Sequence, residues 1–574
     1  MSFQLLKRIL SYTKPYRIYM AGAFVCAALS VGLTLLAPVL VGRAIDNIIG
    51  KGNVNFAAIA HICAIIAIAV AGAAAFQWLM GLCTSVLSYR TIFDLRKHLF
   101  AKLHSVPLSF IDSTPHGDII SRIVNDTDAV GDGLLQGFTQ LFSGILTIVA
   151  TLAFMLVINY KIALIIFVIT PLSLFVSAFI AKLSAKRYME QAETQGELSS
   201  YVEEITGNQR LVIAFNEQAE VQEKFEEINN RLYTCGQKAQ FASSLSNPST
   251  RFVNAIIYTA ACIAGALAAI SGGMTIGTVS CFLTYATQYT RPFNEITSVI
   301  GQIQSSFAGA KRIFAVLDEE NQPPDEPNAA ALTTCNGNVT VRDVSFSYTP
   351  QQNLIKNFNL VVKSGQKIAI VGPTGCGKTT LINLLMRFYD TNSGTISIDG
   401  IPSTSITRSS LRQLYGMVLQ DSWLFGGTVR ENLCYGNPNA TDKEIISAAK
   451  AAYAHEFIMH TENGYNTIIT EDGGNLSGGQ KQLLCIARVL LCNACMLILD
   501  EATSNIDTLT EVRVQKAFAK MMQGKTSFVV AHRLSTIQTA DVILVMNNGN
   551  IIEQGSHEEL IAKQGFYYEL FNAK

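Results

Sequence analysis

The sequence predicts two domains of different fold class. The first is an N-terminal, all-α transmembrane domain of six helices with long cytoplasmic extensions, and the second is a C-terminal α/β domain with a phosphate-binding loop. Three observations lead to this prediction. Long windows without charged residues lie before residue 302, a glycine-rich loop follows a β-like run near residue 372, and further β-like runs end in polar residues. With 574 residues, the chain has room for both domains.

Composition narrows the classes of partner and site. The formal net charge is zero, which gives no reason to expect nucleic acid as a partner. Many of the twelve cysteines lie in apolar runs, where a free thiol behaves as a small hydrophobic group. Cys492 and Cys495 form a single CxxC without the second pair that zinc requires. We therefore expect structural cysteines and a reduced, cytosolic C-terminal domain.

The first 300 residues contain the predicted membrane spans. A spanning helix needs about 20 mostly apolar residues, and a charge near its centre is costly. Ser271-Gly272-Gly273 is a turn signal that divides the long apolar window after Phe252 into two spans. Residues 3–10 form either an amphipathic helix at the membrane surface or a frayed terminus. The spans are predicted near 18–42, 56–89, 133–160, 162–181, 252–270 and 278–302.

The breaks between spans set the orientation. The N-terminal segment is basic, and the long polar break from Lys182 to Arg251 carries eight Lys and Arg residues. The positive-inside rule therefore places the N-terminus, both long breaks and the C-terminal domain in the cytoplasm. The long breaks read as helix pairs that continue below the bilayer and turn near 113–118 and 206–220. We expect a transmembrane domain at 1–317, a Pro- and acid-rich linker at 318–337 and the second domain at 338–574.

The phosphate-binding loop follows the β-like run 368–371 and precedes a helical pattern. Glycines at these positions let backbone amides approach phosphate, and the helix N-terminus adds its positive dipole end. Lys378 is expected to reach the β- and γ-phosphates and Thr379 to bind Mg²⁺, while Thr380 packs or contacts the α-phosphate. The predicted loop contacts are Gly372, Pro373, Thr374, Gly375, Cys376, Gly377, Lys378, Thr379 and Thr380.

Three further β-like runs end in candidate catalytic residues. Asp500 and Glu501 end the run 495–499, where one carboxylate can hold Mg²⁺ and the other can polarise the attacking water. His532 ends another run, and ligands of open α/β sheets bind at such carboxyl ends. Gln420 also follows a β-like run, and on chemistry alone its amide fits a structural role as well as contact with metal or water.

In this order, the pieces resemble the nucleotide-binding domain of ABC transporters. The resemblance implies that Tyr348 stacks on adenine, that Gln420 is the Q-loop glutamine and a metal contact, and that Asp500 is the Walker B carboxylate. It further implies that Glu501 is the catalytic base, that His532 is the switch histidine and that Asp507 lies in the D-loop. Leu476, Ser477, Gly478, Gly479 and Gln480 match the LSGGQ signature, which contacts the ATP held by the opposing chain.

The whole chain is similar to half-transporters of the type IV exporter kind, which export drugs or lipids. This resemblance implies ATP-driven export of an amphipathic or hydrophobic substrate across the cytoplasmic membrane by alternating access, with ATP and Mg²⁺ as cofactors. Residues 110–130 and 206–220 match the coupling helices, although Asp472 stands where the loop that reads them usually has Arg. The alternatives are an ATP-gated channel or sensor, and a lipid flippase built on the same fold.

A second half-transporter is required, because one chain has one phosphate-binding loop, the Walker A loop of this family, and one signature. "SNID" (504–507), "QYTRPFNEI" (288–296) and "GFYYELF" (565–571) resemble the catalytically competent half of heterodimeric bacterial exporters. A heterodimer is therefore favoured over a homodimer. The lipid bilayer and a small amphipathic substrate complete the expected partners. Arg291 and Glu295, near the end of the sixth span, either line the transport path or form a structural pair.

Overall fold

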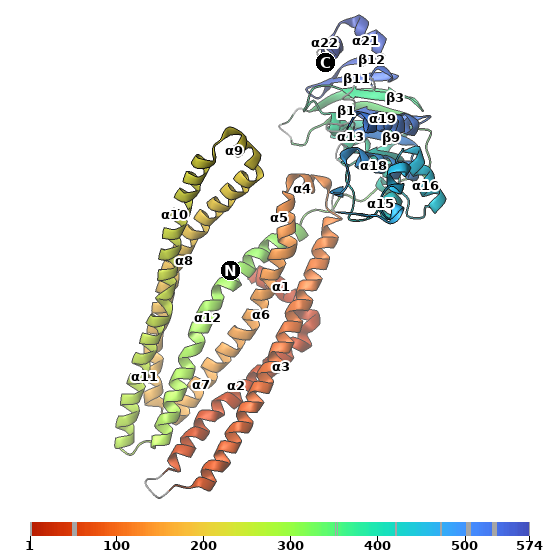
Figure 1. Ribbon diagram of the computed structural model, residues 1–574. Coiled ribbons are helices and arrows are strands. Elements are labelled where there is room, and N and C mark those ends of the chain that lie inside the picture. The colour runs from red at the N-terminus through yellow and green to blue at the C-terminus, as the bar shows by residue number, and fades with distance from the viewer. Residues whose placement is uncertain are drawn as a thin grey trace. The chain divides into compact units, whose positions relative to one another are not determined.

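The computed structural model describes residues 3–48, 54–349, 352, 354–419, 422–470, 473–500, 507–530 and 537–572 (Figure 1). The chain forms two compact units. One comprises Met1–Val106 and Thr114–Glu320, and the other comprises Pro107–Ser113 and Asn321–Lys574. The short segment Pro107–Ser113 therefore belongs with the C-terminal half of the chain, although it lies within the N-terminal half of the sequence.

Apart from an isolated bridge between Ile48 and Val54, the regular elements of the first unit in its described residues are helices, and helices lie over all six predicted spans. The helices over the predicted spans carry apolar residues on most faces, as expected of helices in a membrane. Its elements are α1 Phe3–Thr13, α2 Arg17–Asp46, α3 Phe56–Leu103, α5 His116–Ser121, η2 Arg122–Asp126, α6 Thr127–Gln136, η3 Gly137–Phe142, α7 Ser143–Ile158, α8 Tyr160–Gly207, α9 Gln209–Phe215, α10 Gln218–Ser244, α11 Ser246–Ile270 and α12 Ile276–Leu317.

Four helical segments in the described part of the chain are long and apolar enough to cross a membrane. They are Gln4–Asp46, Phe56–Leu103, His116–Ile158 and Gln218–Ile270, and the apolar stretch Tyr160–Leu172, at the start of α8, is shorter. Helix α12 is absent from this group because hydroxyl side chains, Gln288 and Arg291 dilute its apolar residues. That all six helices cross the membrane stays a prediction. Arg291 Nε lies 2.8 Å from Glu295 Oε1, so these two residues pair with each other.

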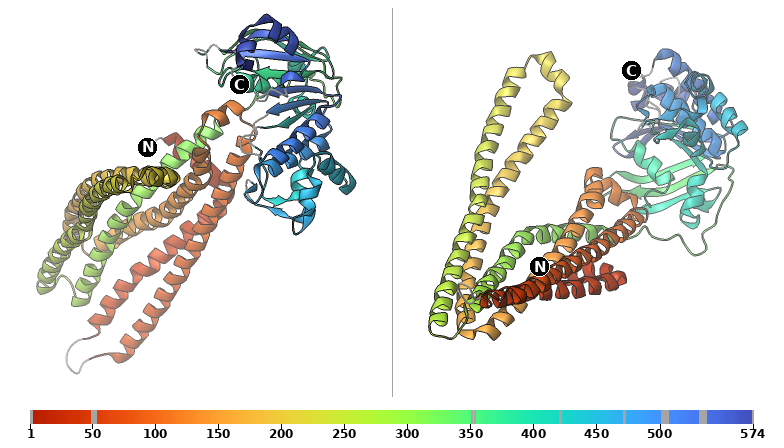
Figure 2. Two further views of the ribbon diagram at one scale, coloured as in Figure 1. Left: turned by 45° about the horizontal axis from the view of Figure 1, so that its top comes forward. Right: turned by 60° about the horizontal axis from the view of Figure 1, so that its bottom comes forward.

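Helices α8 and α10 lie side by side in every view and are joined at their tip by α9 (Figure 2). The break that precedes α8 falls at Asn159, whose extended backbone ends α7 and whose side chain accepts hydrogen bonds from the Lys161 and Ile162 amides. Arg231 Nη2 and Glu197 Oε1 connect the pair at 2.5 Å. The second long break is thus a helical hairpin, as its polar helical pattern predicts.

Helix α12 is held to the rest of its unit at several points. Asp46 at the end of α2 accepts a hydrogen bond of 2.8 Å from the Gly277 amide, at the first turn of α12. Asp126, which is buried, accepts two hydrogen bonds from Arg312. At the last residues of the unit, both oxygens of Asp318 accept from Arg8 of α1 at 2.5 Å. The amphipathic N-terminal helix is therefore anchored to the end of α12.

The second unit contains a six-stranded sheet of order β12-β11-β3-β10-β9-β6 and a four-stranded antiparallel sheet of order β2-β1-β4-β5. In the larger sheet every pair except β11–β12 is parallel. The strands are β1 Val339–Phe346, β2 Ile355–Val362, β3 Lys367–Val371, β4 Ser393–Ile398, β5 Ile401–Pro402, β6 Tyr415–Val418, β7 Gly427–Thr428, β8 Ile468–Ile469, β9 Met496–Asp500, β10 Thr526–Val530, β11 Val542–Asn547 and β12 Asn550–Gly555.

The larger sheet is buried on both faces because its strands are continuous apolar runs. Successive residues of β3 alternate between two cores: Ala369 and Val371 face the core that α18 covers, and Ile368 and Ile370 face the core that α13 covers. The helices are α4 Leu108–Ser113, α13 Lys378–Leu385, α14 Arg408–Gln413, α15 Val429–Cys434, α16 Asp442–Ala451, α17 His455–Met459, α18 Gly478–Cys492, α19 Thr508–Met522, α21 His557–Lys563 and α22 Phe566–Asn572.

The predicted linker is anchored to the second unit. Asp325 accepts a hydrogen bond of 3.0 Å from Arg408, and Arg408 in turn pairs with Asp390 at 2.9 Å. Further along, the Ala330 amide donates to the Ser405 carbonyl at 2.8 Å. A Pro- and acid-rich composition would equally suit a loose spacer. Here the acidic residue supplies an ion pair that fixes the segment.

Candidate nucleotide site

The glycine-rich loop connects β3 to α13, at the carboxyl edge of the central strands. Gly372 leaves no room for a side chain, since a Cβ there would lie 2.2 Å from the Met546 carbonyl oxygen. Gly377 has φ = 103°, a conformation that L side chains rarely adopt, and it stands directly before α13. The loop therefore places backbone amides and a helix N-terminus together, which is the arrangement that binds phosphate.

Lys378, the first residue of α13, folds back over the loop. Its Nζ donates to the carbonyl oxygens of Gly372 and Pro373, both at 2.9 Å. This ammonium group is thus positioned at the mouth of the loop, where a phosphate oxygen can replace a carbonyl as its partner. Cys376, by contrast, is 3% exposed and packs in the core beside α13, so only its backbone is available to a ligand.

A cavity of about 400 Å³ opens beside the loop. Thr379 and Asp500 both line it, although 121 positions separate them in the sequence. A hydroxyl and a carboxylate in one cavity are oxygen ligands of the kind that Mg²⁺ prefers. The lining comprises Tyr348, Gln352, Leu354, Thr374, Gly375, Gly377, Lys378, Thr379, Thr380, Asp500 and Val530.

Tyr348 forms the aromatic end of this cavity. Its ring packs edge-on against Phe346 and Tyr389, with centroids 5.0 Å away in each case. Its hydroxyl donates to Thr380 Oγ1 at 3.2 Å and accepts from Asn383 Nδ2 at 3.3 Å. The residue is nevertheless 42% exposed and lines the cavity, so it is available for stacking against a planar ligand.

The strands that lead to the other predicted catalytic residues are adjacent and parallel. Val530 of β10 is in register with both Ile370 of β3 and Asp500 of β9, and Val418 of β6 is in register with Leu499. Because parallel strands end at one edge, Asp500 stands beside the loop. Gln420, Glu501 and His532 follow these strand ends in the sequence but lie outside the described residues. Asp472 also lies outside them.

The signature residues form the N-terminus of a different helix. Ser477 caps α18: its hydroxyl accepts from the Gln480 amide at 3.3 Å, and the Gln480 side chain accepts from the Ser477 amide at 2.9 Å. Leu476 packs against the core, whereas Ser477 and Gly478 are exposed and Gly479 is buried. None of these five described residues lines the cavity of the glycine loop. The exposed helix end is therefore open to a ligand presented from outside this chain.

Asp507, the predicted D-loop residue, caps α19. Its carboxylate accepts a hydrogen bond of 2.9 Å from the Thr510 amide, and this bond lowers the pKa of Asp507. The side chain thus has a structural role in the single chain. Whether it also contacts a second chain stays a prediction.

Helix α4 docks on the aromatic cluster. Asp112 Oδ2 accepts a hydrogen bond of 2.6 Å from the Tyr389 hydroxyl, and Tyr389 packs against Tyr348. Burial and the bond to Asp112 raise the pKa of Tyr389, so the hydroxyl remains a donor at physiological pH. The segment 107–113 is thereby connected through two tyrosines to the cavity.

Sequence reasoning missed several residues of this site. Leu354 and Val530 supply apolar walls of the cavity, and Tyr389 links Tyr348 to α4. Val530 could have been found, because it ends the strand that leads to His532. Tyr389 carries no local signal, since its role depends on contacts with residues 41 and 277 positions away.

Together these features define a class: a membrane protein with a P-loop ATPase whose site is bounded by an aromatic side chain and a strand-end carboxylate. The models of two families match, "ABC transporter transmembrane region" at residues 20–293 and "ABC transporter" at residues 355–504.

Known relatives cover nearly the whole chain. An uncharacterized ABC transporter ATP-binding protein of Bacillus subtilis, YfiC, is 40% identical over 99% of this chain and 94% of its own length. A fatty acid ABC transporter ATP-binding/permease protein of Mycobacterium bovis is 41% identical over 92% of this chain and 83% of its own. The structure of a bacterial Atm1-family ABC exporter with ATP bound is 27% identical, with a TM-score of 0.79 over 97% and 98% of the two chains.

The chain therefore belongs to the ABC transporter family, and it is a multi-pass membrane protein with a nucleotide-binding ATPase coupled to transport. The exporter fold implies that it works as a dimer. This explains why the signature lies away from the chain's own phosphate loop.

Proposed function

We propose that the chain is one half of an ATP-driven exporter that moves an amphipathic or hydrophobic molecule, with fatty-acyl compounds as the favoured class. The observation that carries this proposal is one cavity that joins Lys378, Thr379, Asp500 and the exposed face of Tyr348, on a chain with apolar helices long enough to cross a membrane. The similarity to a fatty acid transporter supports the substrate class.

ATP is bound by the residues that line this cavity. The adenine stacks on Tyr348, the phosphates lie on the loop from Gly372 to Gly377, and Lys378 exchanges its carbonyl partners for phosphate oxygens. Ser477 and the amides of Gly478 and Gly479 hold the γ-phosphate of the ATP on the opposing chain. The phosphates of each nucleotide then lie between helix N-termini from different chains.

Thr379 and Asp500 fit a magnesium ion, since both supply oxygen to the same cavity, and Gln420 is the third proposed contact. When bound, the ion neutralises charge that develops on the phosphates. Glu501 orients and deprotonates the attacking water, and His532 contacts the γ-phosphate. Hydrolysis rests on positioning of the attacking water and on stabilisation of charge on the phosphates, and it requires both chains.

The ATPase unit and the N-terminus are placed in the cytoplasm, with the helices in the cytoplasmic membrane. ATP closes the two ATPase domains, and α4 together with the α8–α10 hairpin carries that closure to the spans. The transport path between the membrane spans then alternates from inward to outward facing. The contact of Asp112 with Tyr389 supports this role for α4.

The test of the base is Glu501→Gln. This variant should bind ATP as the wild type does and lose nearly all hydrolysis, while Glu558→Gln, a matched change in the first turn of α21, should keep both. Turnover near the wild-type rate in Glu501→Gln would remove Glu501 from the mechanism.

The partner is proposed to be a different half-transporter, so that the working unit is a heterodimer. Affinity purification of the tagged chain from its native membrane decides between the two assemblies. A second, untagged half-transporter in the eluate at equal amount supports the heterodimer. Recovery of only this chain, as a dimer with ATPase activity, would establish a homodimer.

A further inference from the structure

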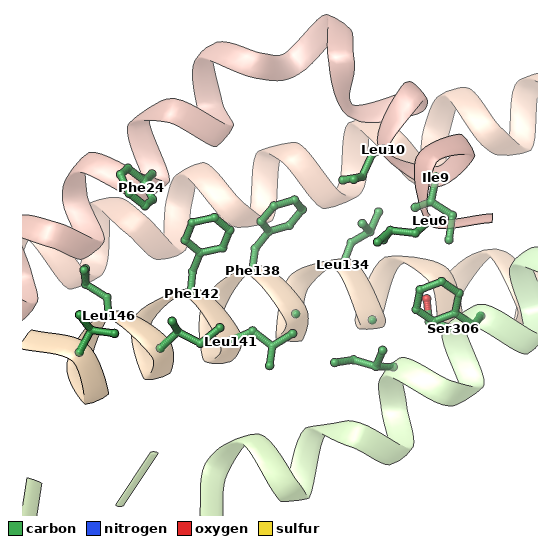
Figure 3. Close-up of a pocket in the computed structure, with 16 residues that line it drawn as sticks. Leu6, Ile9, Leu10, Phe24, Leu134, Phe138, Leu141, Phe142, Leu146 and Ser306 are labelled. Atoms are coloured by element: carbon green, nitrogen blue, oxygen red, sulfur yellow. The ribbon is translucent and has the colours of Figure 1, made fainter. Parts of the chain in front are cut away.

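An apolar cavity of the membrane unit lies beneath α1. It has a volume of about 620 Å³ and runs between α1, α2, the η3–α7 segment and α12 (Figure 3). A second cavity of about 280 Å³ shares its residues Phe24, Phe138 and Phe142. The first is lined by Leu6, Ile9, Leu10, Phe24, Gly133, Leu134, Gly137, Phe138, Leu141, Phe142, Ile145, Leu146, Val149, Ile303, Ser306 and Phe307.

The lining offers almost nothing to water. Ser306 is its single polar side chain, and the Ser306 hydroxyl already faces the Val130 carbonyl oxygen at 3.4 Å. A cavity without polar partners does not hold water stably. Six of the lining side chains are more than a third exposed at the surface of the chain, among them Phe24 and Val149. In the single chain, the apolar lining is therefore open to the surface.

One wall is built to leave space. Segment η3, Gly137–Phe142, is a π-helix, a wide turn that is rare and frequently marks functional sites. Gly137 has φ = −59°, which any residue adopts, so its backbone does not require glycine. A Cβ at Gly137 would meet no atom within 4 Å, whereas one at Gly133 would lie 2.2 Å from Ser306. The glycine at 137 thus widens the cavity and has no packing duty.

The helix above the cavity is cationic. Residues 3–17 carry Lys7, Arg8, Lys14 and Arg17 and no acidic residue. Leu6, Ile9 and Leu10 of α1 face the cavity, while Lys7 and Lys14 are exposed and Arg8 is engaged by Asp318. Such a helix at the membrane surface attracts anionic headgroups. Phe24 lies seven residues into α2, about 10 Å along the helix, so the cavity extends from the surface into one leaflet.

We propose that this cavity binds an acyl chain of an anionic membrane lipid, with the phosphate of its headgroup held by Lys7 and Lys14. The apolar lining accepts the acyl chain, and α1 positions the headgroup at the membrane surface. The occupant is a resident lipid of the leaflet next to α1. The site is separate from the nucleotide cavity and does not depend on which molecule is exported.

The test uses a phosphatidylglycerol probe with a photoreactive diazirine in one acyl chain, in proteoliposomes of phosphatidylglycerol and phosphatidylcholine. Illumination should label peptides from residues 3–13 and 133–149. Gly137→Leu fills the cavity and should reduce this labelling at least fivefold. Gly81→Leu is the control, because Gly81 is also a half-buried helical glycine with nothing within 4 Å of an added Cβ, outside this cavity. Leu141→Trp fills the same space from a second position if Gly137→Leu does not fold.

The headgroup is tested with the same acyl probe on phosphatidylcholine. Wild type should label several-fold more with the phosphatidylglycerol probe, and Lys7→Gln/Lys14→Gln should remove that preference. Equal labelling of folded Gly137→Leu or Leu141→Trp and of wild type would overturn the acyl-chain site. Equal labelling of wild type by both headgroups would overturn the anionic lipid. If the wild-type peptides stay unlabelled and Phe138→Cys cross-links to a second chain, protein covers the cavity. That result would also overturn the proposal.

Discussion

Replacement of Tyr389 by Phe removes one hydrogen bond and keeps the ring. The wild-type hydroxyl donates to Asp112 at 2.6 Å, and this bond joins α4 to the aromatic cluster of the nucleotide cavity. A hydrogen bond to a charged group contributes about 1.5–3 kcal/mol. Asp112 is exposed and Tyr389 only half-buried, so water competes for the carboxylate. We therefore expect a loss of about 1 kcal/mol, roughly a fivefold change in the equilibrium that opens α4 away from the ATPase unit.

Hydrogen exchange of the full chain in lipid nanodiscs measures this opening directly. Amides in a peptide covering α4 should exchange about fivefold faster in Tyr389→Phe, while amides of α18 should be unchanged. Tyr435→Phe, a change at an exposed tyrosine, is the control. A double-mutant cycle with Asp112→Ala, which removes the acceptor, should return an interaction energy of about 1 kcal/mol.

Two results would refute the role of the Tyr389 hydroxyl in holding α4. Unchanged exchange of α4 in Tyr389→Phe would mean that the bond does not hold the helix. Faster exchange throughout the ATPase unit would mean that Tyr389 acts on global stability and not on α4.

Three further predictions concern the nucleotide cavity and its supports. Tyr348→Phe should keep ATP affinity while Tyr348→Ala weakens it about 10-fold or more, measured with a fluorescent ATP analogue, because base stacking contributes about 1–3 kcal/mol. Ser477→Arg should stop hydrolysis of the ATP held by the opposing chain but leave ATP binding to this chain's own loop unchanged, since the signature acts on the opposing chain's nucleotide; a parallel loss of binding would contradict this. Burial alone would raise the pKa of Asp399, but hydrogen bonds from Asn338 and Asn336 lower it. The Asp399 carboxylate therefore stabilises the linker above the ordinary carboxyl pKa of about 3.9, and this stabilisation is lost as pH falls through the lower pKa of the folded state. The hydrogen-exchange protection of residues 336–340 should follow this pH dependence. In Asp399→Asn, the protection of these residues should not depend on pH in this way.

Local patterns were sufficient for much of the fold. The charge-free windows coincide with helices, and the glycine loop lies between a strand and a helix, since these signals depend on neighbouring residues only. The break predicted near Lys161 occurs two residues earlier, because Asn159 both ends α7 and caps α8. The position of Asp500 beside the loop follows from parallel topology, whereas the order of the central strands was not predicted.

Contacts between distant segments were not predictable in the same way. The bond of Asp112 to Tyr389 and the ion pairs of Asp325, Arg408 and Asp390 join residues that are far apart in the sequence. Composition marks Asp325 as part of an acidic linker but gives no partner for it. The cavity beneath α1 likewise needs four helices in place, and the space at Gly137 is visible only when its surroundings are known.

Lipid transfer across a reconstituted bilayer directly tests ATP-driven export of a fatty-acyl molecule. The purified dimer is placed in liposomes with its ATPase domains outside, and a fluorescent fatty-acyl lipid is followed into the inner leaflet or lumen. An ATP-driven exporter should give transfer that requires ATP and Mg²⁺ and is absent in Glu501→Gln, although that variant still binds ATP. Transfer at the same rate without ATP, or in Glu501→Gln, would contradict it and indicate a channel or a passive lipid carrier.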